Sequence, residues 1–109
     1  IPDYLAYSAA KGGIRSMSKA IAIHCRRERL KIRCNSVHPG SINTPMVHHA
    51  LKELVDVDLG AMKDQEKARL SMGIGEPDDV AHMVAYLLSD VSKHVNGAEM
   101  VVDNGDTVV

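Results

Sequence analysis

Hydrophobic residues recur at three- and four-residue intervals along the first quarter of the chain. Ile14, Met17, Ile21 and Cys25 follow this spacing, with small alanines between them. The pattern predicts a long amphipathic helix from about residue 7 or 8 to residue 29. Its first turns, YSAAKGG, consist largely of small residues, so a ligand or another backbone can approach this end of the helix closely.

A short apolar run comes next and ends abruptly. Ile32, Cys34 and Val37 lie in KIRCNSV, and the residues His38-Pro39-Gly40 then favour a turn. The run predicts a strand of about five or six residues. Because polar and apolar residues do not alternate strictly, the pattern favours a strand buried on both faces, as in a parallel sheet.

The remaining elements follow from turn and helix-start signals. Residues 44–71 show a weak helical periodicity interrupted by VDVDLG, which predicts one or two loosely packed helices in a lid or substrate loop. GEPDDV predicts a helix start with Pro77 at its first position, continuing to about Ser89. AEMVVD predicts a last short strand. Helix, strand, variable helices, helix and strand in this order predict an α/β layered domain.

Composition narrows the class of protein. The 109 residues suffice for at most one domain, with 45% hydrophobic residues for its core. A net charge of −1 gives no reason to expect nucleic acid or a membrane as partner. Cys25 and Cys34 lie in apolar patterns, so free thiols in a reducing, cytoplasmic compartment are expected. The six histidines show no HxxxH spacing and there is no CxxC, so no metal site is expected.

Two tyrosines precede one lysine at helical spacing in YLAYSAAK. Tyr7 lies four residues before Lys11 and Tyr4 lies seven before it. On a helix all three share one face, with Tyr7 nearest the ammonium group. By itself a YxxxK pattern is also compatible with ordinary surface residues.

The separate motifs agree in order and spacing. Tyr7–Lys11 begins a helix, NSVHPG ends a strand, and GEPDDV followed by NGAEMVVDNG supplies a closing helix and strand. In this arrangement the chain resembles the C-terminal half of a short-chain dehydrogenase/reductase over nearly its whole length, most weakly at Val47–Arg69. The resemblance implies that residues 1–109 are the C-terminal part of a doubly wound, parallel-sheet (Rossmann-like) α/β domain. The N-terminal half, which would bind the cofactor phosphates, is expected to precede Ile1.

The resemblance implies a role for the Tyr–Lys pair. Tyr7 would be the general acid/base for hydride transfer between NAD or NADP and a secondary alcohol or ketone. A phenol ionises only near pH 10, so it needs a neighbouring cation, which Lys11 supplies one turn on. Lys11 would also hold the nicotinamide ribose hydroxyls. Tyr4 and Met46 are expected at the substrate, although Tyr4 could equally pack on the surface.

The turn after the first strand is the second implied binding element. The backbone near Ile42 and the hydroxyl of Thr44 would bind the nicotinamide carboxamide. Pro39 and Gly40 would permit the sharp turn and the close approach, and in the simpler interpretation they only end a strand. Asn35 is expected to tie the strand to neighbouring loops. The loop ERLKI lacks the family's usual glycine.

Several functional alternatives remain at this point. VHPGSINTP and GEPDDV look closest to members that act on bulky secondary alcohols or hydroxysteroids. A catalytically silent cofactor-binding or scaffold member of the same fold is the main alternative, and a small helical interaction domain with a chance YxxxK is another. Ala20, Ala22 and Ile23 widen the apolar surface of the long helix, which predicts a helix buried on two faces. The resemblance implies that this helix pairs across a homodimer and that the last strand region can complete a homotetramer.

Overall fold

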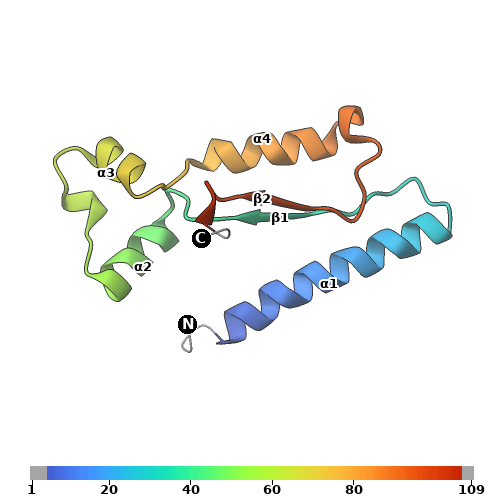
Figure 1. Ribbon diagram of the computed structural model, residues 1–109, viewed down its shortest axis with the longest axis horizontal. Coiled ribbons are helices and arrows are strands. Elements are labelled where there is room, and N and C mark those ends of the chain that lie inside the picture. The colour runs from blue at the N-terminus through green and yellow to red at the C-terminus, as the bar shows by residue number, and fades with distance from the viewer. Residues whose placement is uncertain (1–4, 107–109) are drawn as a thin grey trace. The chain divides into compact units, whose positions relative to one another are not determined.

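The computed structural model describes residues 5–106, in which helices alternate with two short strands (Figure 1). In chain order the elements are α1 (Leu5–Arg27), β1 (Ser36–Pro39), α2 (Pro45–Val55), the 3₁₀ helix η2 (Leu59–Ala61), α3 (Gln65–Ser71), α4 (Pro77–Leu88), the 3₁₀ helix η3 (Asp90–Ser92) and β2 (Glu99–Val102). The chain divides into two compact units. The first unit comprises residues 1–37 and 85–100, and the second comprises residues 38–84 and 101–109.

The two strands pair in parallel. Ser36 N donates to Ala98 O at 3.0 Å, and Gly40 N donates to Val102 O at 2.9 Å. The pairing therefore advances in the same direction along both strands, which form a two-stranded sheet. Parallel neighbours need a crossover, and here α4 lies in that connection. The predicted α/β class with parallel strands is confirmed.

The first strand is shorter than predicted and begins later. The expectation from Ile32 onward is wrong, since β1 begins at Ser36. Side chains take the place of the strand ladder before that residue. Cys34 N donates to the Asn96 side chain at 3.0 Å, and the Asn35 side chain accepts from Ala98 N at 2.9 Å and donates to Val95 O at 2.9 Å. Asn35 thus ties the strand to the neighbouring loop, as expected.

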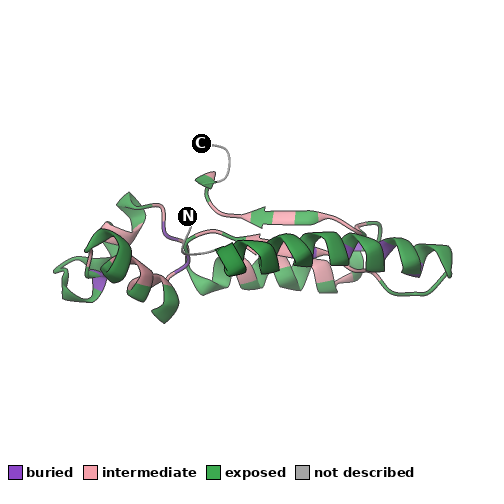
Figure 2. Cartoon of the chain, turned by 90° about the horizontal axis from the view of Figure 1, so that it is seen from below, coloured by how far each residue is buried: buried purple, intermediate pink, exposed green. Residues whose placement is uncertain are grey.

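In the first unit, α1 uses small residues for its buried face. Ser18, Ala22 and Cys25 are buried, whereas Ile14 and Met17 of the predicted apolar stripe are exposed. Most of the helix is exposed, as the green ribbon of α1 shows in Figure 2. The reason is the close approach of Gly97: a Cβ atom there would lie 3.3 Å from the Cβ of Ala22. A larger residue at position 22 would push this loop away.

The end of α1 departs from the prediction by two residues. The helix ends at Arg27, and Arg29 takes a left-handed conformation with φ of 55°. Leu30 N then donates to Cys25 O at 2.9 Å, which closes the last turn. Arginine therefore occupies a position where glycine would have no steric cost, in the loop ERLKI, which contains no glycine.

Arg33 is the main polar anchor of the first unit. Its guanidinium donates to Val95 O at 3.1 Å, to Leu87 O at 2.9 Å and to the Ser92 hydroxyl at 3.2 Å. Carbonyls at the end of α4 and in the loop before β2 are thereby satisfied by one side chain. Its cation lies where the helix dipole is negative.

The second unit contains the predicted helices between residues 44 and 71. Thr44 caps α2 with its side chain, Pro45 is the first helical residue, and Asp56 ends the helix in a left-handed conformation. Neither α2 nor α3 has a fully buried residue, so the loose packing is also as predicted. Leu59 of η2, 1% exposed, is the central buried side chain here.

The start of α4 matches its sequence signals. Pro77 is its first residue, and Asp79 in the first turn accepts a hydrogen bond from Glu76 N at 2.7 Å. The carboxylate satisfies an amide that has no partner within the helix. Within residues 5–106, no helix combines the length and the apolar character needed to cross a membrane.

Candidate functional site

Tyr7 and Lys11 lie one turn apart near the start of α1. The Lys11 ammonium sits over the Tyr7 ring, 5.2 Å from its centroid. This distance permits a cation–π interaction. Half of the Tyr7 surface is exposed. The sequence-based placement of the two side chains on one helical face is confirmed, and their catalytic roles stay predictions.

The helix surface beside this pair is open. A Cβ atom on Gly12 or Gly13 would meet no other described atom within 4 Å, apart from the helix's own backbone. The small residues that follow Lys11 therefore leave room for a ligand against the backbone. Tyr4, the other tyrosine expected near Lys11, lies outside the described residues.

In the second unit, Gly40 is required by the end of β2. A Cβ atom on Gly40 would lie 2.6 Å from the Cβ of Asp103 and 2.8 Å from its Cα. Since these are backbone and near-backbone atoms, they cannot move aside cheaply. Gly40 therefore allows the backbone at position 40 to pass close to Asp103 of the same chain. Pro39, the residue before it, is the last residue of β1.

The backbone around Ile42 is held by a short parallel bridge to Gly75. Asn43 N donates to Gly75 O at 2.8 Å, and Gly75 N donates to Ser41 O at 2.9 Å. The Ile42 side chain is 7% exposed, so it is packed as part of the core. The bridge therefore fixes the backbone of this turn.

Thr44 uses its hydroxyl twice within the chain. The Oγ1 donates to Ile42 O at 3.2 Å and accepts from Val47 N at 3.4 Å. A hydroxyl has one donor and two acceptor lone pairs, so one lone pair is left for a ligand N–H. Met46 lies in the following first turn of α2 and is 67% exposed.

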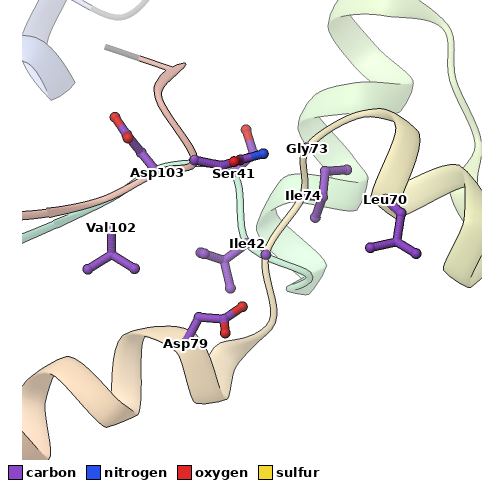
Figure 3. Close-up of a pocket in the computed structure, with 10 residues that line it drawn as sticks. Ser41, Ile42, Leu70, Gly73, Ile74, Asp79, Val102 and Asp103 are labelled. Atoms are coloured by element: carbon purple, nitrogen blue, oxygen red, sulfur yellow. The ribbon is translucent and has the colours of Figure 1, made fainter. Parts of the chain in front are cut away.

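A cavity of about 420 Å³ adjoins this turn in the second unit (Figure 3). Its walls combine apolar and acidic or amide side chains: Ser41, Ile42, Leu70, Gly73, Ile74, Gly75, Asp79, Val102, Asp103 and Asn104. Of these residues, Ile42 was identified as a candidate from the sequence. Asp103 and Asn104, which directly follow the last strand and line the cavity, were not.

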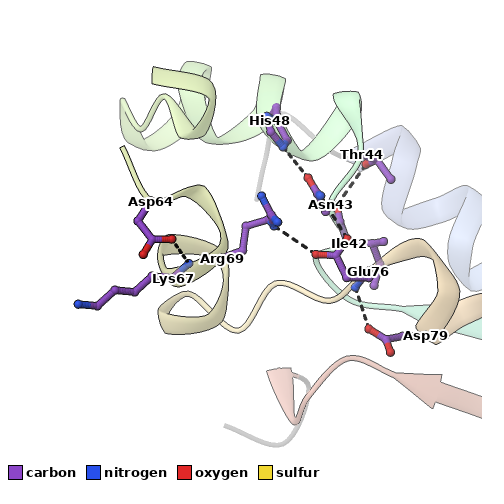
Figure 4. Close-up of polar contacts among 9 residues, drawn as sticks. All are labelled: Ile42, Asn43, Thr44, His48, Asp64, Lys67, Arg69, Glu76 and Asp79. Atoms are coloured by element: carbon purple, nitrogen blue, oxygen red, sulfur yellow. Dashed lines mark hydrogen bonds and ion pairs between the residues drawn. The ribbon is translucent and has the colours of Figure 1, made fainter. Parts of the chain in front are cut away.

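A polar cluster behind the turn was also missed. Asn43, His48, Arg69 and Glu76 are linked through their side chains (Figure 4). They come from the turn, α2, α3 and the residue before α4. No spacing rule connects four such segments, so the sequence carried no local signal for this cluster.

Each unit, taken by itself, has polar groups that are chemically compatible with part of a nicotinamide cofactor. The Lys11 ammonium has three donors for hydroxyl groups, and Thr44 retains an acceptor for an amide N–H. No GxGxxG segment for a pyrophosphate occurs in the 109 residues. Tyr7 and Lys11 belong to the first unit and the turn belongs to the second, and the geometry of each is defined within its own unit.

Comparison with known sequences gives consistent relatives. A family profile described as "Enoyl-(Acyl carrier protein) reductase" matches residues 1–107. The NADP-dependent (R)-specific alcohol dehydrogenase of Lentilactobacillus kefiri is 42% identical over 107 residues, covering 97% of this chain and 40% of that protein. The 3-beta-hydroxysteroid dehydrogenase of Comamonas testosteroni is 34% identical over 104 residues, covering 95% of this chain and 40% of that protein. The chain thus spans about 40% of the length of these curated relatives.

Solved structures agree with the sequence relatives. A short-chain dehydrogenase family protein from Francisella tularensis superposes with a TM-score of 0.77 at 28% identity, covering 100% of this chain and 46% of that one. A short-chain dehydrogenase from Mycobacterium paratuberculosis, bound to NAD, gives 0.68 at 31% identity, covering 96% and 39%. The α/β structure is therefore part of a Rossmann-type fold. The chain belongs to the short-chain dehydrogenase/reductase family.

Proposed function

We propose that the full-length protein is an NAD- or NADP-dependent oxidoreductase that interconverts a secondary alcohol and a ketone. The observation that carries this proposal is the Lys11 ammonium 5.2 Å from the centre of the Tyr7 ring on an open helix end. The names of the relatives support it, since they include an alcohol dehydrogenase and a hydroxysteroid dehydrogenase. Hydroxysteroids are accordingly among the candidate substrates.

Tyr7 moves the proton in this proposal. During oxidation its phenolate takes the proton of the alcohol hydroxyl while the C–H hydrogen leaves as hydride and the C=O bond forms. During reduction Tyr7 donates a proton to the carbonyl oxygen. The nicotinamide, when bound, accepts or supplies the hydride.

Lys11 and the turn have supporting roles. In this proposal the Lys11 ammonium would balance the negative charge on the Tyr7 oxygen during the proton transfer. Its N–H groups would hold the nicotinamide ribose. The remaining lone pair of Thr44 would accept from the carboxamide N–H₂, with the backbone near Ile42 as the second contact, and Met46 would contact the substrate.

The proposal assigns residues 1–109 to the C-terminal portion of a single Rossmann-type domain. The preceding portion of that domain would bind the cofactor phosphates. The length of the curated relatives supports this assignment, because the chain covers only 40% of the alcohol dehydrogenase. Phosphate binding requires a glycine-rich turn at a helix N-terminus. The part of each relative that this chain does not cover is long enough to contain such a turn.

We also propose that the full-length protein forms a homodimer or homotetramer. Its other partners would be small molecules, namely the alcohol or ketone substrate. Ile14, Met17, Ile21 and Ile23 of α1 are all at least 41% exposed. They lie on more than one side of the helix, and a wide apolar surface is usually buried on two faces. The mass of the purified full-length protein by light scattering tests this proposal, and a monomer at all concentrations would overturn it.

The functional test uses the full-length protein and the absorbance of reduced nicotinamide. NAD and NADP are each paired with acyclic secondary alcohols, cyclic alcohols and hydroxysteroids, and the corresponding ketones are tested with the reduced cofactors. We expect turnover with at least one class of secondary alcohol. Cofactor binding without turnover of any of them would instead support the catalytically silent alternative.

A further inference from the structure

The turn that carries Ile42 and Thr44 is linked to α2 and to the residue before α4 by one amide side chain, that of Asn43. Asn43 Oδ1 lies 2.7 Å from His48 Nε2 in α2. Its Nδ2 donates to Glu76 Oε2, at 3.2 Å, just before α4. The side chain thus bridges two segments from within the turn itself (Figure 4).

Glu76 extends the bridge to α3. Its second carboxylate oxygen, Oε1, accepts from Arg69 Nε at 3.2 Å. The Arg69 side chain is 18% exposed and that of Glu76 is 51% exposed, so the ion pair is only partly shielded from water. Both carboxylate oxygens of Glu76 are therefore occupied, one by Asn43 of the turn and one by Arg69 of α3.

The direction of the hydrogen bonds is fixed by chemistry. A carboxylate only accepts, so Asn43 must present its N–H₂ group to Glu76 and its oxygen to His48. His48 Nε2 therefore donates. An aspartate at position 43 would still accept from His48, but it would place a second carboxylate against Glu76.

We propose that Asn43 is a positioning residue that sets the geometry of both the carboxamide-binding turn and the substrate-side helix α2. This inference rests on the proposed function of the turn. Asn43 lies between Ile42 and Thr44, and its partner His48 lies two residues after Met46. A shift of this amide moves the groups that would hold cofactor and substrate, while Tyr7 and Lys11 belong to the other unit.

The test is a polarity swap in the full-length enzyme. Asn43→Asp alone removes the donor to Glu76 and adds repulsion, and Glu76→Gln alone removes one acceptor. Combined, they restore every bond, because the new amide donates to the new carboxylate and still accepts from Arg69. Gln65→Glu is the control for the added charge: it places a negative charge in the first turn of α3 outside the cluster, and the bond that it loses, from Gln65 Nε2 to Gly60 O, is exposed.

We expect each single variant to raise KM for the alcohol and Kd for the cofactor by about 3- to 10-fold, the loss of roughly one hydrogen bond. We expect kcat to stay within about twofold, since the proton-transfer pair is untouched. In the double variant, KM and Kd should return to about the wild-type values. In the control, both should stay close to those values. Additive effects in the double variant, or a loss confined to kcat, would overturn the proposal.

Amide hydrogen exchange in the absence of cofactor separates this inference from the proposed function. Faster exchange across residues 45–71 in Asn43→Asp, reversed by Glu76→Gln, would support the positioning role even if the wild-type enzyme turned over none of the alcohols tested. Unchanged exchange in Asn43→Asp would overturn the role while leaving the oxidoreductase proposal intact.

Discussion

Each of the two units is stabilised internally by a different kind of polar contact. In the first unit, Arg33, Asn35 and Asn96 bond mainly to backbone groups of distant segments. In the second unit, Asn43 and Glu76 bond to other side chains. A backbone partner persists whatever residue replaces its side chain, whereas a side-chain partner disappears when either residue changes.

This difference matches what each unit would do. The proposed proton-transfer pair needs only two residues at i and i+4 on a helix, held by contacts that few substitutions disturb. The proposed cofactor and substrate contacts depend on a network in which one substitution alters several segments. Substrate preference should therefore respond to changes in the second unit, and the chemical step to changes in the first.

The largest expected effect comes from removing the proposed acid/base in the first unit. Tyr7→Phe in the full-length enzyme should lower kcat by about 10²- to 10⁴-fold, because the ring remains but no proton can be transferred. Cofactor affinity, measured by fluorescence titration, should change little. Tyr86→Phe, on α4, is the matched control and should keep its activity. A Tyr7→Phe variant with more than about a tenth of wild-type turnover would remove Tyr7 from this role.

Two lysines of α1 allow a catalytic role to be distinguished from a purely structural one. Lys11→Met should lower kcat and also weaken cofactor binding, since the same ammonium would stabilise the phenolate and hold the ribose. Lys19→Met loses a bond to Gly97 O at 3.3 Å and an exposed ion pair with Glu99. It should cost at most about 1 kcal/mol of unfolding free energy and leave the kinetics unchanged. Equal kinetic losses in both variants would contradict the assignment of Lys11.

The sequence predicted those parts of the fold that depend on local signals. Pro77 with the acidic residues after it placed the start of α4, and the YxxxK spacing placed Tyr7 and Lys11 on one face. The predicted turn was only partly right: β1 ends before Gly40, but His38 and Pro39, which were expected in the turn, are its last two residues. Each of these is a property of a few neighbouring residues, so one sequence suffices to recognise it.

The parts that the sequence did not predict depend on contacts between distant segments. β1 begins at Ser36 because the Asn35 and Asn96 side chains replace the ladder before it. The buried face of α1 includes Ala22 rather than Met17, because it meets a glycine more than seventy residues away in sequence. The Asn43–Glu76 bond joins segments 33 residues apart. No local period or motif encodes such pairs.

In the second unit, Gly40→Ala should lower the unfolding free energy by about 1–3 kcal/mol, as overpacking usually does. The added methyl group would lie 2.6 Å from the Cβ of Asp103. Gly60→Ala is the matched control, because its nearest neighbour, Asp58 Oδ1, would lie at an ordinary 3.5 Å. Chemical denaturation of the full-length protein measures both variants. Equal stability of the two would show that the close approach at Gly40 is not limiting.

The smallest effect should come from the hydroxyl of Thr44, where stability and binding can be separated. Thr44→Val keeps the shape of the side chain but loses the N-cap bond to Val47 N, which should cost about 1 kcal/mol of unfolding free energy. Thr44→Ser keeps the hydroxyl and should be nearly as stable as the wild type.

Cofactor affinity then tests the remaining lone pair of Thr44. If that lone pair accepts from the carboxamide, the valine variant should raise the cofactor Kd by about 2- to 10-fold, whereas the serine variant should stay close to the wild type. A valine variant that loses stability but binds cofactor normally would leave Thr44 with a capping role alone. The carboxamide would then depend on the backbone near Ile42, which the bridge to Gly75 holds in place without any hydroxyl.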